Sequence, residues 1–83
     1  MATDIRVAGI VKRSLVIAGH RTSVSLEDAF WRRLQEIAGE KGVSVNALAA
    51  DVDATRGEAN LSSALRVFIL ETLTSRFGPD RTG

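Results

Sequence analysis

The chain has 83 residues, of which 45% are hydrophobic and 25% charged, with no cysteine and a single histidine. This length allows one domain, the absence of cysteine excludes disulfides, and one histidine without a thiol is a poor ligand set for structural zinc. A chain this short buries little apolar surface alone, so we expect two copies to associate. We expect neither a cofactor nor a metal site.

Positive charge is concentrated in the N-terminal third, although the net charge of the whole chain is only +1. Residues 1–26 contain four basic side chains and one acidic side chain (4 − 1 = +3), whereas residues 46–83 contain four basic and five acidic ones. Clustered cations favour nucleic acid as a partner. With no apolar membrane span and no secretory signal pattern, we expect a cytoplasmic protein.

The first element that the pattern predicts is a short strand over residues 21–26. Its side chains alternate between a polar set (Arg21, Ser23 and Ser25) and an apolar or β-branched set (Thr22, Val24 and Leu26). Residues 1–11 show no period and are expected to form a flexible arm. Residues 14–17 are compatible with a hairpin that turns at Gly19 onto this strand, and the sequence leaves this alternative open.

Three helices follow the strand. Acidic residues at 27 and 28 open the first helix, with Ser25 or Leu26 near its N-cap, and Gly42 ends it. Ser44 is a natural N-cap for a second helix over about 45–55, and Asn60 caps a third helix that extends to about residue 77. Residues 78–83 are expected to fray.

Apolar positions at helical spacing predict which side chains form the core. The expected core of the dimer consists of Val24, Leu26, Phe30, Leu34, Ile37, Leu48 and Val52. Trp31 lies beside a core position and is expected to pack, against the third helix, rather than to form an exposed stacking platform. Most of the apolar surface of the third helix should be buried.

The match from Arg21 to about Ala54, which contains the segment RTSVSLEDAFWRRLQEIAGEKGVSVNALAADV, resembles the strand–helix–turn–helix of the ribbon-helix-helix family, which includes the Arc and methionine repressors. The stretch KRSLVIAGHRTSVSLEDAFW also resembles a subgroup of short bacterial members. The resemblance implies an α+β, mostly helical fold: a homodimer with an intersubunit antiparallel β-ribbon and an extra C-terminal helix, with the domain over residues 12–77.

The resemblance also implies a DNA-binding surface, because a two-stranded ribbon fits the major groove. The implied base-contacting residues are Arg21, Ser23 and Ser25. The implied phosphate contacts are Ser44, Val45 and Asn46 at the start of the second helix, with Lys12, Arg13 and His20 as additional candidates. If the hairpin forms, the sheet of a ribbon-paired dimer becomes four-stranded and too wide for simple insertion.

The function implied is that of a sequence-specific DNA-binding transcriptional regulator, a repressor, found with the nucleoid and bound to double-stranded DNA. The alternative is a protein–protein interaction module, antitoxin-like or a scaffold, that uses the third helix, assembles beyond the dimer or with a partner, and does not bind DNA directly. The sequence assembles no nucleophile, base and oxyanion site, so we do not expect an enzyme.

Overall fold

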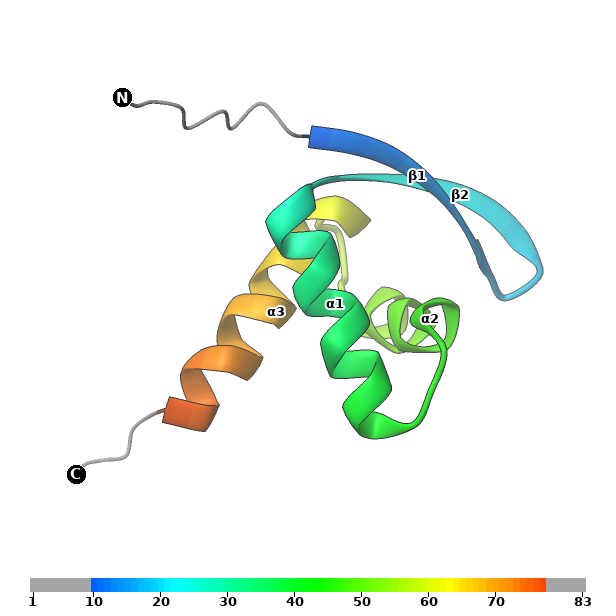
Figure 1. The fold of residues 1–83 in the computed structure, drawn as a ribbon. Helices are drawn as coiled ribbons and strands as arrows, with labels where there is room; N and C mark the ends of the chain where they lie inside the picture. Colours follow the sequence, from blue (N-terminus) through cyan, green and yellow to red (C-terminus); the bar gives the residue numbers. More distant parts are fainter. Residues whose placement is uncertain (1–9, 78–83) are drawn as a thin grey trace.

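The computed structural model describes residues 10–77, which form a two-stranded antiparallel sheet and three helices that lie together on one side of it (Figure 1). The elements are β1 (Ile10–Ile17), β2 (His20–Glu27), α1 (Asp28–Lys41), α2 (Val45–Thr55) and α3 (Leu61–Phe77). The α+β, mostly helical fold with an extra C-terminal helix is therefore confirmed. None of these three helices is long and apolar enough to cross a bilayer.

The two strands form a hairpin within one chain, which resolves the alternative that the sequence left open. β1 pairs with β2 along its whole length, from Ile10 opposite Glu27 to Ile17 opposite His20. β1 begins inside the segment 1–11 that the sequence predicts as an arm. Residues 1–9 and the predicted frayed tail, residues 78–83, lie outside the described residues.

A two-residue turn joins the strands. Ala18 and Gly19 both have a positive φ, 53° and 82°. Two successive left-handed residues match the right-handed twist of a hairpin, and glycine accepts this conformation without steric strain. Gly19 is where the sequence predicts the turn, whereas an alanine at the first turn position is unfavourable because its Cβ crowds the backbone.

Both strands contribute to the core through the sheet face that covers the helices. Leu15 and Ile17 of β1 are buried beside Val24 and Leu26 of β2. The helices add Leu34, Ile37, Ala38, Leu48, Ala49, Val52, Leu61, Leu65 and Ile69. All of the predicted core residues are buried except Phe30, which is half-buried. One chain thus forms this core, with β1 supplying the second strand.

Local capping signals set the helix ends as the sequence predicts. Gly42 is left-handed (φ 72°) and its N–H donates to the Gly39 carbonyl at 3.1 Å. The Ser44 hydroxyl accepts from the Ala47 N–H at 3.0 Å, and the Asn60 side chain accepts from the Ser63 N–H at 2.8 Å. α1 begins later than predicted, with Glu27 as its N-cap, because Ser25 and Leu26 remain in the strand.

The outer side of α3 departs from the prediction of a mostly buried helix. Its buried stripe is Leu61, Leu65 and Ile69, but Val67 and Leu70 are 52% and 61% exposed. These two side chains lie on the side of α3 turned away from the core, so the chain leaves an apolar surface there.

The strained turn predicts that Ala18→Asn stabilises the protein. Asparagine tolerates the left-handed region better than alanine, so we expect a gain of about 0.5–1 kcal/mol in the free energy of unfolding. Gly19→Ala, at φ 82°, should lower stability by a similar amount. Urea unfolding followed by circular dichroism measures both; equal midpoints for Ala18→Asn and the parent chain would contradict the turn geometry.

Candidate nucleic-acid interface

The hairpin face turned away from the helices is the candidate site. The pairing register brings Lys12 opposite Ser25, Ser14 opposite Ser23, and Val16 opposite Arg21 on this outer face of the ribbon. All of these side chains are exposed except Ser25, which is half-buried. β1 therefore lies beside β2 in the plane of the sheet and leaves the outer face of β2 open.

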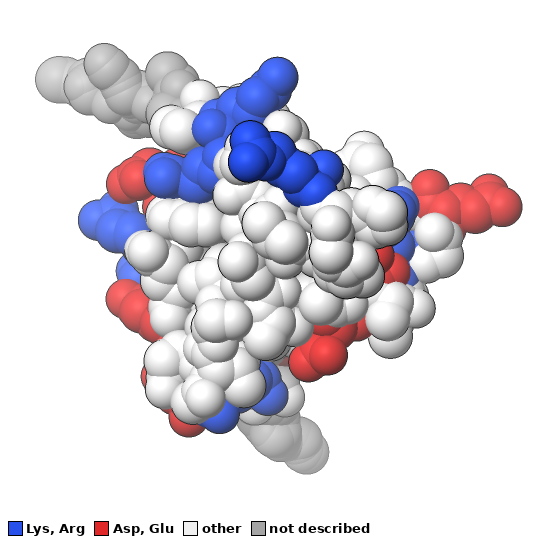
Figure 2. Space-filling view, turned by 90° about the vertical axis from the view of Figure 1, so that its right-hand side faces the viewer, with Lys and Arg blue, Asp and Glu red and all other residues white. Residues whose placement is uncertain are grey.

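This outer face is electropositive. Within the described hairpin, residues 10–27, the charged side chains of this face are Lys12 and Arg21 against Glu27 alone (2 − 1 = +1). Lys12 and Arg21 form no ion pair within residues 10–77, so their charges remain available to a ligand. Figure 2 shows basic side chains gathered at the top of the molecule, where the hairpin lies.

The three predicted base-contacting residues differ in their surroundings. Arg21 and Ser23 project into solvent from the turn end and the middle of β2, respectively. Ser25 is tied to α3: its backbone N–H donates to the Ser62 hydroxyl at 2.9 Å, and its carbonyl accepts from the Arg66 guanidinium at 3.0 Å. Ser25 thus marks the end of the open part of the ribbon.

The predicted phosphate anchor lies at the edge of the ribbon. The Asn46 side chain, in the first turn of α2, accepts a hydrogen bond from the Val16 N–H at 3.3 Å. Ser44 caps the same helix, and the side chain of Val45 is half-buried. The contact between α2 and β1 places this helix N-terminus next to the outer face, although Ser44 and Asn46 already accept hydrogen bonds from within the chain.

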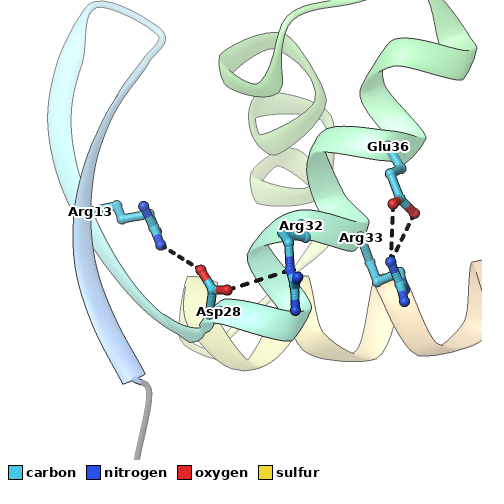
Figure 3. Close-up of polar contacts among 5 residues, drawn as sticks. All are labelled: Arg13, Asp28, Arg32, Arg33 and Glu36. Atoms are coloured by element: carbon cyan, nitrogen blue, oxygen red, sulfur yellow. Dashed lines mark hydrogen bonds and ion pairs between the residues drawn. The ribbon is translucent and has the colours of Figure 1, made fainter.

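Arg13 lies on the opposite face of β1 from Lys12. Its guanidinium pairs with Asp28 at 3.4 Å and stacks over the Trp31 ring, 4.6 Å from the ring centroid. Asp28 also pairs with Arg32 at 3.4 Å, so one carboxylate links β1 to α1 (Figure 3). The Arg13 Nε atom is buried without a hydrogen-bond partner among the described residues. These contacts attach β1 to the first helix.

Each ring of the aromatic pair at the start of α1 lies near a guanidinium. The cationic neighbour of Trp31 comes from β1 rather than from the third helix. The preceding residue, Phe30, lies near α3, with the Arg66 guanidinium 6.0 Å from its ring centroid. Adjacent residues on a helix point in different directions, and only the packed structure shows which neighbour each one meets.

His20 is exposed at the turn end of β2. Within residues 10–77, no three histidine, aspartate or glutamate side chains are grouped so that they could hold a metal ion. This placement is compatible with a contact at the rim of a bound polyanion.

Ser14 and Val16 are the outer-face residues that the sequence analysis did not assign to the site. In KRSLVI, the side chains of Lys12, Ser14 and Val16 are exposed, while Leu15 and Ile17 between and after them are buried. Such alternation is a strand signal. The exposed but apolar Val16 obscures this alternation, because it makes residues 15–17 a continuous apolar run.

Arg66 and Glu27 attach α3 to the end of β2. The Arg66 Nε atom donates to the Glu27 carboxylate at 3.0 Å, in addition to the contact with the Ser25 carbonyl. The pKa of Glu27 is lowered from its ordinary value of 4.5, first by a hydrogen bond from its own backbone N–H and then by the Arg66 side chain. The carboxylate is therefore favoured in the folded chain.

Comparison with known proteins places the fold in context. The family described as "Ribbon-helix-helix domain" matches residues 10–73, from the start of β1 to within the last turns of α3. Among solved structures, the chain is similar to an uncharacterized protein from Bordetella pertussis Tohama I, with a TM-score of 0.75 and 36% identity. The match covers 90% of this chain but 64% of that protein, so this chain spans less than two thirds of its length. None of the curated proteins compared with the chain matches it.

The lowered pKa of Glu27 predicts part of the pH dependence of stability. Because the folded-state pKa lies below the unfolded value, the carboxylate stabilises the fold above the unfolded pKa, and this contribution is lost as pH falls through the folded pKa. We expect Glu27→Gln to reduce the decline of the urea midpoint below about pH 5. Arg66→Gln should reproduce part of this effect; parallel pH curves for the parent and Glu27→Gln would contradict it.

Proposed function

Because the chain belongs to the ribbon-helix-helix family, we propose that it is a sequence-specific DNA-binding regulator of transcription that places its ribbon in the major groove. The observation that supports this most is the outer face of the ribbon, where Arg21 and Ser23 are exposed while the other face is packed on the core. A rigid backing of this kind holds base-contacting side chains in a defined position.

The chemistry of the outer face suits base edges. The Arg21 guanidinium offers two parallel donors that match the O6 and N7 acceptors of guanine, and the Ser23 hydroxyl can donate or accept. Ser25 lies at the end of the open surface and is proposed as a third, less exposed contact.

Phosphate contacts are proposed to supply most of the affinity. The start of α2, with Ser44, Val45 and Asn46, presents a positive helix end beside the ribbon. Lys12 and His20 flank the open surface as further contacts. Arg13 has less support than Lys12 because it pairs with Asp28 on the other face of the hairpin.

Repression is proposed to follow from occupancy of an operator by a homodimer, which would bring two hairpins to double-stranded DNA in the nucleoid. This action needs no cofactor and no chemical step. The second copy supplies the additional affinity that one small domain lacks, because linking two contacts multiplies their effect.

Loss of the Arg21 side chain tests the proposal. Selection from random-sequence duplex DNA first defines the preferred site, and fluorescence anisotropy at two salt concentrations then measures affinity for that site and for unrelated DNA. Arg21→Ala should weaken binding to the selected site by about 1–3 kcal/mol and reduce its preference over unrelated DNA. Lys41→Ala, a matched loss of one exposed charge on α1, should preserve the preference. Absence of DNA binding by the unaltered chain at low salt would reject the function.

An interaction module is the second candidate, and the exposed side of α3 favours it. Between α2 and α3 lies an open groove of about 350 Å³ lined mainly by apolar or small side chains. Val67 lines this groove, and the exposed Leu70 lies on the same helix. An antitoxin-like or scaffold protein would use this surface to bind a protein, without direct contact to DNA.

Leu70→Glu tests the interaction surface. The side chain is 61% exposed, so the fold should tolerate glutamate, whereas an interface on this side of α3 would bury an unpaired charge. We expect the self-association constant, measured by sedimentation over a range of concentrations, to weaken about tenfold or more. Gln35→Glu on the exposed face of α1 is the control. Identical sedimentation of the parent chain and Leu70→Glu would rule out self-association through this surface.

A further inference from the structure

We propose that the DNA-contacting ribbon is the hairpin of a single chain, and that β1 contributes Lys12 and Ser14 to base recognition beside Arg21 and Ser23 of β2. This inference rests on the proposed function and deepens it, and it assigns Lys12 to base edges in place of the phosphate contact proposed above. It replaces the intersubunit ribbon, in which each of two chains provides one strand, by a ribbon whose two strands belong to the same chain.

Each edge of the hairpin is bound at one residue by side chains of the same chain. At the β1 edge, the Val16 N–H donates to Asn46. At the β2 edge, the Ser25 N–H and carbonyl are bound by Ser62 and Arg66. A strand from a second chain would need these backbone groups, so pairing along the full length of either edge would break contacts with α2 or α3.

A two-stranded ribbon fits the major groove, whereas the four-stranded sheet made by joining two hairpins edge to edge does not. The contacts from Asn46, Ser62 and Arg66 favour a sheet that remains two strands wide. A dimer is still compatible with this arrangement if the two copies associate away from the ribbon edges.

The register of the hairpin determines how closely the outer-face side chains of the two strands approach each other. The backbone N–H groups of Val16 and Ser25 point away from the partner strand. The pairs Val16–Arg21 and Lys12–Ser25 are therefore non-hydrogen-bonded pairs. The pair Ser14–Ser23 lies two residues from each of them and is of the same kind. In such pairs the Cα atoms approach to about 4.5 Å, so the side chains of the two strands form one continuous surface.

The outer face of the hairpin combines cationic side chains with hydroxyls. Lys12 lies toward the open end of β1 and Arg21 toward the turn end of β2, so two cations flank a central pair of hydroxyls from Ser14 and Ser23. Lysine and arginine both donate to guanine O6 and N7. Acidic side chains are absent from the described outer face except at Glu27, which is bound to Arg66.

The surface has no internal two-fold symmetry. Lys12 faces Ser25 across the ribbon, whereas Arg21 faces Val16, whose exposed methyl groups are suited to an apolar contact such as a thymine methyl. A ribbon formed by two identical strands would contact a palindromic sequence. A hairpin of this composition would contact a non-palindromic one, with Lys12 and Arg21 at different base pairs.

Site selection with single variants tests this assignment. Lys12→Ala and Ser14→Ala, both at exposed positions, are compared with Arg21→Ala and with the control Lys41→Ala by sequencing DNA selected by each protein. We expect Lys12→Ala to weaken binding about tenfold and to relax the preference at a base pair different from the one affected by Arg21→Ala. A uniform loss of affinity with a smaller salt slope would instead identify Lys12 as a phosphate contact and overturn the assignment.

The failure of this inference can be told apart from failure of the proposed function. If Arg21→Ala relaxes the preference while Lys12→Ala and Ser14→Ala leave it unchanged, DNA binding stands and the β1 contribution is rejected. If the parent chain selects no DNA at all, the function is rejected, and the inference with it.

Cysteine crosslinking measures the ribbon's composition directly, because the chain has no cysteine of its own. Ser23→Cys combined with Ser14→Cys should form a disulfide within one chain, seen as monomer on a non-reducing gel. Ser23→Cys alone should remain a free thiol when bound to DNA. Efficient disulfide-linked dimers from Ser23→Cys alone would show two β2 strands paired across a two-fold axis and would overturn the proposal.

Discussion

The rest of the structure depends on the antiparallel pairing of β1 with β2. A lone β2 strand, followed directly by α1, would expose two rows of backbone groups and leave the helices without a second strand to cover them. Pairing through a two-residue turn gives one row of β2 backbone groups its hydrogen-bond partners. It also brings Leu15 and Ile17 onto the helices beside Val24 and Leu26. The same pairing forms the continuous polar face on the other side, so the core and the candidate interface arise from one event.

The helices do more than cover the sheet. The second residue after each cap, Asn46 after Ser44 and Ser62 after Asn60, accepts a backbone N–H from one edge of the ribbon. The starts of α2 and α3 therefore hold opposite edges, and β1 and β2 are each tied to a helix distant in the sequence. This arrangement gives the third helix a structural role at the candidate interface, in addition to any role of its exposed side.

Polar and apolar surfaces are separated on the molecule. Lys12 and Arg21 lie on the hairpin, while Val67 and Leu70 lie on α3, which extends away from it (Figure 1). A polyanion and a protein partner would therefore meet different elements and need not compete. DNA binding through the hairpin and association through α3 are compatible in one protein, and the second would raise the affinity of the first by linking two hairpins.

The sequence by itself determined the elements whose signals are local. Gly42, Ser44 and Asn60 specify helix ends through contacts a few residues away, and the alternation of β2 assigned Arg21 and Ser23 to the outer face. Only the tertiary structure decided how β1 pairs with β2. This pairing places Lys12 on the outer face and Arg13 on the opposite face, over the Trp31 ring. The physical reason is that strand pairing depends on contacts between distant residues, here the packing of Leu15 and Ile17 on the helices. A helix cap or the two faces of a strand depend only on residues close together in the sequence.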